Sequence, residues 1–328
     1  MHVRSRWIAL VLALALAAPA CNAAKDAIRE ERRQVRHDLR SQRPERGVLA
    51  DGTISASAGA IVVSTSAENP YDGLGTWIDI YDDEAWADPW ATVASMRAVG
   101  VRTIYLQTSN FNRGQPFVHA EGVVRFLDAA AANGLDVVAW YLPGFRDVRT
   151  DRKRALAAIR FVTPSGNRFA SFALDIESPE VADPAARTRR LLGLSNHLRR
   201  EVGPDYRLGA IVPSPRRVRT DPHYWSAFPY REIAEVYDVF LPMTYFTYRV
   251  AGRDGAAWYT AKNILILRQE TAGLQVPIHV IGGIASDASA QETRGFVDTI
   301  RARDVIGASY YTFPMIRDDQ WRALRTIG

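Results

Sequence analysis

The sequence of 328 residues contains a single cysteine, Cys21, and this scarcity excludes several classes of protein. One cysteine cannot form an internal disulfide framework, a cysteine-rich zinc module or a cysteine-ligated iron–sulfur cluster. The six histidines are scattered, and no HxH, HxxxH or HExxH pattern occurs, so the common histidine-based metal sites have no local signature. We therefore expect neither a metal ion nor another cofactor.

Positive charge is only slightly in excess, since the formal net charge is +5. This balance favours acidic surfaces or ligands, but no nucleic-acid-binding motif accompanies it, so we expect no nucleic acid partner. What the sequence does have is typical of a globular domain with a sizeable core. Hydrophobic residues make up 47% of the chain and charged residues 23%, and aromatic residues are plentiful enough to line a binding groove as well.

The beginning of the chain is predicted to be an export signal, residues 1–20. Arg4 and Arg6 precede an apolar run of about ten residues, which is too short to span a bilayer. Ala18-Pro19-Ala20 then gives a small-x-small cleavage pattern, and Cys21 follows directly, as in a bacterial lipobox. We expect lipidation of Cys21 to anchor the protein at the outer face of a bacterial membrane. The alternative is ordinary cleavage and secretion, with an incidental cysteine.

Residues 21–70 are predicted to form a charged stalk and a flexible linker. Acidic and basic side chains alternate densely in the first half of this segment, and Ser, Ala and Gly dominate the second half. From residue 71 to residue 328 the pattern changes, because short apolar runs rich in Val, Ile, Tyr and Phe alternate with stretches of helical periodicity. We expect this second part to be one domain.

Eight of the apolar runs are predicted to be strands, and most are too continuously apolar for a sheet with one face in water. Asp88-Pro89 and Asp183-Pro184 place a capping residue before a proline at the start of a helix. Eight strand–helix pairs in about 260 residues predict an α/β fold of the (β/α)8 TIM barrel type. A doubly wound open sheet is the alternative, without a GxGxxG or Walker pattern to support it. The predicted strands are 75–82, 103–110, 136–144, 169–178, 207–215, 236–246, 277–285 and 305–315.

In such a barrel, functional residues lie at the carboxyl ends of the strands. Asp175 and Glu177 are two residues apart on the fourth predicted strand, so both side chains point the same way. Two carboxylates this close should raise one pKa and give a protonated acid beside an ionised partner, the combination that glycoside hydrolysis uses. The alternative is a structural pair bound to nearby arginines or to loop amides.

The seventh predicted strand contains no Asp or Glu, which disfavours barrels that take a nucleophile from that strand. A mechanism with both key groups near the fourth strand fits better. One such mechanism uses the acetamido group of the substrate as the nucleophile, with the Asp orienting it and the Glu acting as the acid.

The Asp175-Ile176-Glu177 strand, followed by Pro242-Met243-Thr244-Tyr245, resembles the chitinase-type barrels of glycoside hydrolase family 18. The resemblance implies that Glu177 is the acid, Asp175 its partner and Tyr245 the contact of the acetamido oxygen. The sequence departs from the family motif at Ala170 and Ala173, where the family has two earlier Asp residues. Near the end of the eighth strand it offers Tyr311 and Phe313 in place of the usual Trp.

The chain also resembles, less closely, the lysozyme-like barrels of family 25. Those have a DxE on a middle strand and an Asp on the first strand, which Asp79 matches. A buried Asp that holds the barrel rim is the alternative role for Asp79.

Further side chains at the predicted strand ends are expected to bind the glycan. Aromatic rings stack on sugar faces, and arginine binds carboxylate or phosphate groups. The alternatives are that each aromatic residue alone is more often part of the core and that the arginine cluster Arg216, Arg217 and Arg219 is a solvated loop. The predicted substrate-binding residues are Trp77, Asp79, Tyr81, Gln107, Asn110, Trp140, Tyr141, Met243, Tyr311, Phe313 and Arg216.

Three functions remain open from the sequence. The first is an exported, lipid-anchored hydrolase that acts on an N-acetylated glycan, for example one related to peptidoglycan. The second is a non-catalytic glycan-binding barrel, which alanine at Ala170 and Ala173 favours. The third is a purely structural envelope lipoprotein, which the polar and aromatic residues gathered at the predicted strand ends disfavour.

Overall fold

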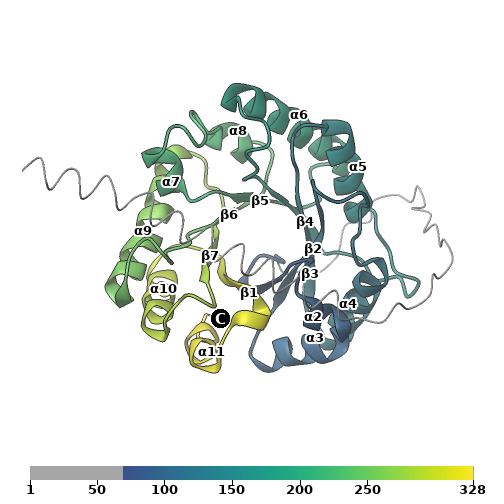
Figure 1. The fold of residues 1–328 in the computed structure, drawn as a ribbon, viewed down its shortest axis with the longest axis horizontal. Coiled ribbons are helices and arrows are strands. Elements are labelled where there is room, and N and C mark those ends of the chain that lie inside the picture. The colour runs from purple at the N-terminus through teal and green to yellow at the C-terminus, as the bar shows by residue number, and fades with distance from the viewer. Residues whose placement is uncertain (1–68, 328) are drawn as a thin grey trace, which may run out of the picture. The chain divides into compact units, whose positions relative to one another are not determined.

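Eight parallel strands form the centre of the structure, a computed structural model that describes residues 69–327 (Figure 1). The hydrogen-bonded order is β6-β5-β4-β3-β2-β1-β8-β7, and isolated parallel bridges from Phe240 to Ile278 and from Met243 to Ile281 join β6 to β7. The sheet therefore closes on itself, and the predicted TIM barrel is confirmed. The strands are β1 (Gly73–Ile78), β2 (Thr103–Asn110), β3 (Asp136–Leu142), β4 (Ser171–Asp175), β5 (Leu208–Val212), β6 (Val239–Pro242), β7 (His279–Ile284) and β8 (Gly307–Tyr311).

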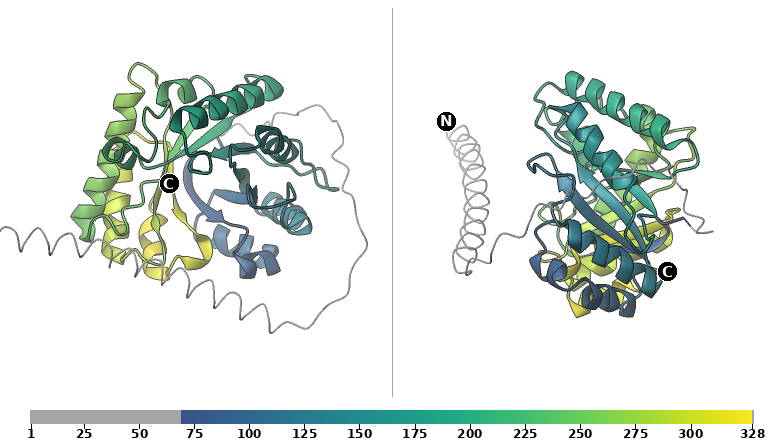
Figure 2. Two further views of the ribbon diagram at one scale, coloured as in Figure 1. Left: turned by 45° about the horizontal axis from the view of Figure 1, so that its top comes forward. Right: turned by 90° about the vertical axis from the view of Figure 1, so that its right-hand side faces the viewer.

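Helices follow the strands and cover the outside of the barrel (Figure 2). Asp88 and Asp183 accept hydrogen bonds from backbone N–H groups of the first turns of α3 and α6, and a proline is the first residue of each helix, as the sequence predicts. The helices are α2 (Asp83–Ala87), α3 (Pro89–Ala98), α4 (Ala120–Asn133), α5 (Val148–Ile159), α6 (Pro184–Val202), α7 (Pro215–Thr220), α8 (Tyr230–Ala234), α9 (Gly252–Glu270), α10 (Ala290–Ala302) and α11 (Asp318–Leu324), with a 3-10 turn η1 (Phe313–Met315).

The structure corrects several boundaries. Strand β2 has the predicted bounds, whereas the other strands are shorter than their apolar runs, because the chain leaves the sheet while its side chains are still buried in loops. The short helices α2 and α7 were not predicted. Helix α7 occupies a segment that the sequence presents as an arginine-rich loop, and Ser214 caps it.

The apolar residues form two layers on either side of the strands. On β3, Val138 and Trp140 point into the barrel, and Val137, Ala139 and Tyr141 pack against the surrounding helices. This alternation explains the nearly continuous apolar strands, since both faces are buried. No helix within residues 69–327 is both long and apolar enough to cross a membrane.

Candidate active site

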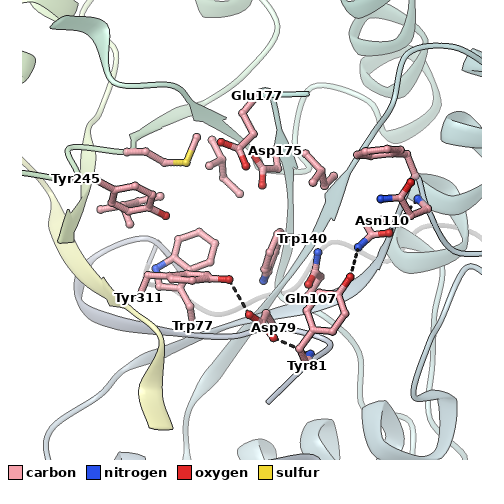
Figure 3. Close-up of a pocket in the computed structure, with 16 residues that line it drawn as sticks. Trp77, Asp79, Tyr81, Gln107, Asn110, Trp140, Asp175, Glu177, Tyr245 and Tyr311 are labelled. Atoms are coloured by element: carbon pink, nitrogen blue, oxygen red, sulfur yellow. Dashed lines mark hydrogen bonds between the residues drawn. The ribbon is translucent and has the colours of Figure 1, made fainter. Parts of the chain in front are cut away.

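A cavity of about 400 Å³ opens at the carboxyl ends of the strands (Figure 3). Residues from all eight strands or from the segments that directly follow them contribute to its wall, so the closure of the barrel brings them together from distant parts of the sequence. The lining residues are Trp77, Asp79, Tyr81, Gln107, Asn110, Phe111, Asn112, Trp140, Leu142, Asp175, Glu177, Ile211, Met243, Tyr245, Ile281 and Tyr311.

Asp175 is the last residue of β4, and Glu177 follows two positions later, so both carboxyl groups project into the cavity. Asp175 is only 5% exposed, and its Oδ1 atom has no hydrogen-bond partner within residues 69–327. Burial raises the pKa of Asp175 well above its ordinary value of 3.8, and the neighbouring charge of Glu177 raises it further. Both effects favour the protonated, neutral form of Asp175.

The residue that precedes Asp175 on the same face of its strand supplies no partner. Ala173 is the preceding residue with the same orientation, and its methyl group packs among the apolar side chains of the barrel interior. It offers no hydrogen bond to the carboxyl group above it. A buried acceptor without a partner favours the neutral form of an acid, because only the neutral form avoids the desolvation of a charge.

Glu177 lies in a different electrostatic environment. Burial raises the pKa of its carboxyl group, whereas the positive charge of Arg217 lowers it. Within residues 69–327 its carboxyl group takes part in no hydrogen bond or ion pair, and only its backbone carbonyl is bound, by the hydroxyl of Tyr224 at 2.8 Å. Glu177 is thus an available proton donor or acceptor that faces the cavity.

Tyr245 follows β6, and its ring centre lies 6.3 Å from that of Tyr311 at the end of β8. Burial raises the pKa of both phenols, and the carboxyl groups of Glu177 and Asp175 raise that of Tyr245 further. Both hydroxyl groups therefore keep their protons. Within the described part of the chain the Tyr245 hydroxyl has no hydrogen-bond partner, so it can donate to a ligand in the cavity.

Asp79 is held in a network of hydrogen bonds beyond β1. Its Oδ2 accepts from the Tyr311 hydroxyl at 2.7 Å, and its Oδ1 accepts from the backbone N–H of Tyr81 at 2.6 Å (Figure 3). The Tyr81 hydroxyl in turn accepts from the Asn110 side chain at 3.4 Å. This geometry gives Asp79 an organising role at the rim of the cavity.

Aromatic rings form the floor and one wall. The Trp77 ring stacks on Tyr105 at 4.3 Å and meets the edge of Trp140 at 5.6 Å. Ser309 accepts the Nε1–H of Trp77 at 2.8 Å, whereas the Nε1 atom of Trp140 is buried and has no partner in the described part of the chain. Gln107 lies close by, fixed through its Oε1 by the backbone N–H of Ile80 at 3.1 Å. These rings and polar tips suit a sugar, which presents apolar faces and hydroxyl edges.

Three residues predicted at the cavity lie elsewhere. Tyr141 points outward from β3, where its hydroxyl donates to Asp151 at 2.6 Å. Phe313 belongs to η1, beyond the end of β8, and packs on Trp321 with ring centres 5.7 Å apart. Arg216 turns toward α9 and lies over the Trp258 ring at 5.3 Å. The other substrate-binding and catalytic residues predicted from the sequence all line the cavity.

The sequence did not single out five lining residues. Phe111 and Asn112 directly follow the predicted end of β2, and extending that segment by two residues would have found them. Leu142, Ile211 and Ile281 are apolar and carry no chemical signal of their own, although the two-residue period of their strands places them inside the barrel.

The structure offers little to hold a metal ion. Within residues 69–327, no group of three or more His, Cys, Asp or Glu side chains is arranged as a possible metal site. Cys21, the predicted lipidation site, and the predicted export signal lie outside the described residues.

Comparison with known proteins gives results at the level of the fold. No family model matches the sequence, and no curated protein matches it. Among solved structures, the endo-β-1,4-mannanase of Thermotoga petrophila superposes with a TM-score of 0.62 and 11% identity, covering 79% of this chain and 76% of the mannanase. The chitinase of Chromobacterium violaceum superposes with a TM-score of 0.52 and 10% identity, covering 77% of this chain and 98% of the chitinase.

The β-mannanase of the blue mussel Mytilus edulis is a third example, with a TM-score of 0.54 and 8% identity over 77% of this chain and 91% of that chain. Identities this low carry information about the fold alone. The cavity described above lies at the carboxyl ends of the strands, which is where (β/α)8 barrels have their functional sites. The chain therefore shares the (β/α)8 barrel fold of these structures.

Proposed function

We propose that the protein is a glycoside hydrolase that cleaves an N-acetylated glycan, with Glu177 as the general acid. The observation that carries the proposal is the convergence of three groups on one cavity, namely the buried carboxyl group of Asp175, the available carboxyl group of Glu177 and the hydroxyl of Tyr245. Aromatic rings beside them supply a surface for the sugar. Mannanases and a chitinase share the fold, which supports a glycan as the substrate class.

The proposed reaction begins with proton transfer from Glu177 to the glycosidic oxygen. The bond between that oxygen and the anomeric carbon then breaks, and the bonding electron pair leaves with the oxygen. The acetamido oxygen of the substrate forms the new bond to the anomeric carbon, which closes a five-membered ring. Water, deprotonated by Glu177 as the base, later attacks the anomeric carbon and breaks its bond to the acetamido oxygen. Asp175 orients the acetamido N–H, and Tyr245 donates a hydrogen bond to the acetamido oxygen.

The pair of carboxyl groups has a further role in this scheme. Neighbouring acids share their protons, and burial raises the pKa of both carboxyl groups, which favours a proton on the pair. When the acetamido N–H approaches Asp175, it favours the ionised form of Asp175. The shared proton is then available to Glu177, where the reaction needs it.

The decisive experiment compares the wild type with Glu177→Gln on N-acetylated chitooligosaccharides and peptidoglycan fragments. We expect the wild type to release products and the variant to be slower by about 10²–10⁴-fold, since a general acid contributes that much. β-1,4-Mannooligosaccharides, which carry a hydroxyl group at C2 and no acetamido group, serve as the comparison substrate. Equal product release by the two proteins would remove Glu177 as the acid. Cleavage of mannooligosaccharides as fast as of chitooligosaccharides would exclude participation of the substrate acetamido group.

A second candidate is a glycan-binding barrel without catalysis. Ala173 supports it, because the residue beneath Asp175 supplies no carboxylate to share its proton. The same experiment separates the two candidates. Binding of chitooligosaccharides by the wild type without release of products would favour the second, and calorimetric titration measures that binding.

We also propose that the protein is exported and anchored through a lipid on Cys21, at the outer face of a bacterial membrane. The position of the single cysteine directly after a cleavage pattern supports this. Metabolic labelling with radioactive palmitate tests it. We expect a labelled wild-type protein in the membrane fraction and an unlabelled Cys21→Ala variant outside it, and equal labelling of both would exclude this anchor.

A further inference from the structure

Three arginines of the short helix α7 carry the same charge but face different surroundings. Arg216 lies over the rings of Trp258 and Tyr259 on α9, at 5.3 and 5.5 Å. Arg219 forms an ion pair with Glu270 at 2.6 Å. Arg217 lies over the Tyr224 ring at 4.1 Å and forms no ion pair with any residue in 69–327.

Helix α7 is held firmly enough to fix these directions. Ser214 caps its first turn by accepting the backbone N–H of Arg217 at 3.2 Å. The buried side chain of Asn263 on α9 accepts hydrogen bonds from the Ser214 hydroxyl at 2.7 Å and from the backbone N–H of Arg216 at 2.9 Å. The fixed position of α7 therefore determines the direction in which each arginine side chain points.

Tyr224 connects Arg217 to the candidate acid. Its hydroxyl donates to the backbone carbonyl of Glu177 at 2.8 Å, and its own carbonyl accepts from Arg187 at 3.1 Å. Burial raises the pKa of the Tyr224 phenol, so the hydroxyl stays a donor. A guanidinium group over a tyrosine ring is attracted by the negative face of the ring, which holds Arg217 beside the end of β4.

The charges around Glu177 come from several elements. Asp175 on β4 is the acidic neighbour whose pKa the charge of Glu177 raises. The charge of Glu177 also raises the pKa of the phenols of Tyr245 and Tyr224, in the segments after β6 and α7. Arg217 on α7 is the cation whose charge lowers the pKa of Glu177. Asp79 also lines the cavity, but it is occupied by Tyr311 and Tyr81.

Resting on the function proposed above, we propose that Arg217 is a positioning residue for the acid, which from its place over Tyr224 stabilises the carboxylate that Glu177 becomes on giving up its proton. The proton leaves the Glu177 oxygen and bonds to the glycosidic oxygen, and the negative charge that remains on Glu177 lies in the field of the guanidinium group. This charge develops only as the reaction proceeds, so Arg217 favours the transition state over the bound substrate.

The test measures the acid directly and through the reaction. In protein labelled with ¹³C at the glutamate carboxyl groups, the Glu177 signal is assigned by its loss in Glu177→Gln, and its titration gives the pKa. We expect Arg217→Gln to raise the pKa of Glu177 by about 0.5–1 unit, because a nearby opposite charge is removed and solvent screens part of it. In kinetics on chitooligosaccharides, kcat should fall several-fold at an almost unchanged KM, and the alkaline limb of the pH profile should move upward by the same amount as the pKa.

Two further variants separate charge from folding. Arg217→Lys keeps the charge and should keep the pKa of Glu177 near that of the wild type. Arg219→Gln removes the same charge from the same helix on the side facing α9, and should leave the pKa unchanged. An unchanged pKa in Arg217→Gln, or an equal rise in Arg219→Gln, would overturn the inference. If the wild type cleaves no glycan, the proposed function fails, while the titration still decides whether Arg217 governs the charge of Glu177.

Discussion

At the amino-terminal ends of the strands, the barrel interior is filled by Tyr71, Tyr105 and His279. All three are fully buried, and His279 Nδ1 is hydrogen-bonded to the backbone carbonyl of Tyr71 at 2.7 Å. Among the residues that the structure describes, the Nε2 atom of His279 and the hydroxyl of Tyr105 have no partners. At the carboxyl ends, Asp175 and Trp140 likewise bury polar atoms without partners in this part of the chain, but these two residues line a cavity.

Burial alone therefore does not distinguish a site from a core. It lowers the pKa of His279 to about 4 and raises that of Asp175, and in both cases the neutral form is favoured. The difference lies in what is next to the buried group. Asp175 has a second carboxyl group, Glu177, and open space for a ligand, whereas His279 has aromatic rings and backbone. The comparison predicts that changes at the amino-terminal ends of the strands, the lower end of the barrel, affect stability. Changes at the carboxyl ends, the upper end, should affect activity.

The largest loss of stability is expected from Gly307→Ala, at the lower end. A Cβ at this position would lie 2.5 Å from the carbonyl oxygen of Gly73 and 2.6 Å from Nδ1 of His279, so the backbone or the histidine must move. We expect a loss of about 3 kcal/mol in the free energy of unfolding, measured in urea. Gly193→Ala is the matched control. It lies in α6 with nothing within 4 Å of the added Cβ, and should instead gain about 0.5–1 kcal/mol.

The next effect concerns His279 and pH. The folded pKa of about 4 lies below the ordinary 6.5, so between these values the unfolded chain binds a proton that the folded protein excludes. Stability is thus lost as the pH falls from 6.5 toward 4, by about 3 kcal/mol at 1.4 kcal/mol per pH unit. The His279→Gln variant should lack this part of the acid sensitivity, and the exposed His223→Gln should retain it. Urea unfolding across this pH range measures both, and parallel curves for wild type and His279→Gln would contradict the prediction.

The same comparison shows how much the sequence could reveal. The number of strands could be counted from apolar runs, and the two-residue spacing of Asp175 and Glu177 placed both on one face. The choice between Trp140 and Tyr141 could not be made this way. Alternation says that they face opposite sides of β3, but both sides of a barrel strand are buried, so hydrophobicity does not tell which side is the interior.

The direction of the arginines after β5 could not be predicted from the sequence, for another reason. Which of Arg216, Arg217 and Arg219 faces Glu177 depends on the residue at which α7 begins, and that in turn depends on Asn263, some fifty residues later in the chain. Phe313 was misplaced because the chain leaves β8 at Tyr311 and turns into η1. Contacts between distant segments of the sequence decide such details.

A smaller effect of opposite sign is expected at the upper end from Asp175→Asn. The folded pKa of Asp175 is raised, so above pH 3.8 the unfolded chain ionises while the folded protein keeps its proton, and this residue costs stability as the pH rises. An amide of similar shape should raise the free energy of unfolding at pH 7 by about 1–3 kcal/mol, with little gain below pH 3.8. Glycan hydrolysis should fall sharply. A variant less stable than the wild type at pH 7 would show that Asp175 is a structural group, as in the core below it.

The smallest effect is expected from variants on the two faces of β3, Tyr141→Phe on the outer face and Trp140→Phe on the inner face. Tyr141→Phe removes a hydroxyl that donates to Asp151 at 2.6 Å and accepts from Arg154 at 3.2 Å, so we expect a loss of about 1–2 kcal/mol in stability. Glycan binding and kcat should not change, because Tyr141 lies outside the cavity. Trp140→Phe, one residue earlier, should weaken glycan binding through the lost indole surface and N–H. If calorimetry found the same loss of affinity in both variants, the division between interior and exterior of the barrel would not separate function from stability.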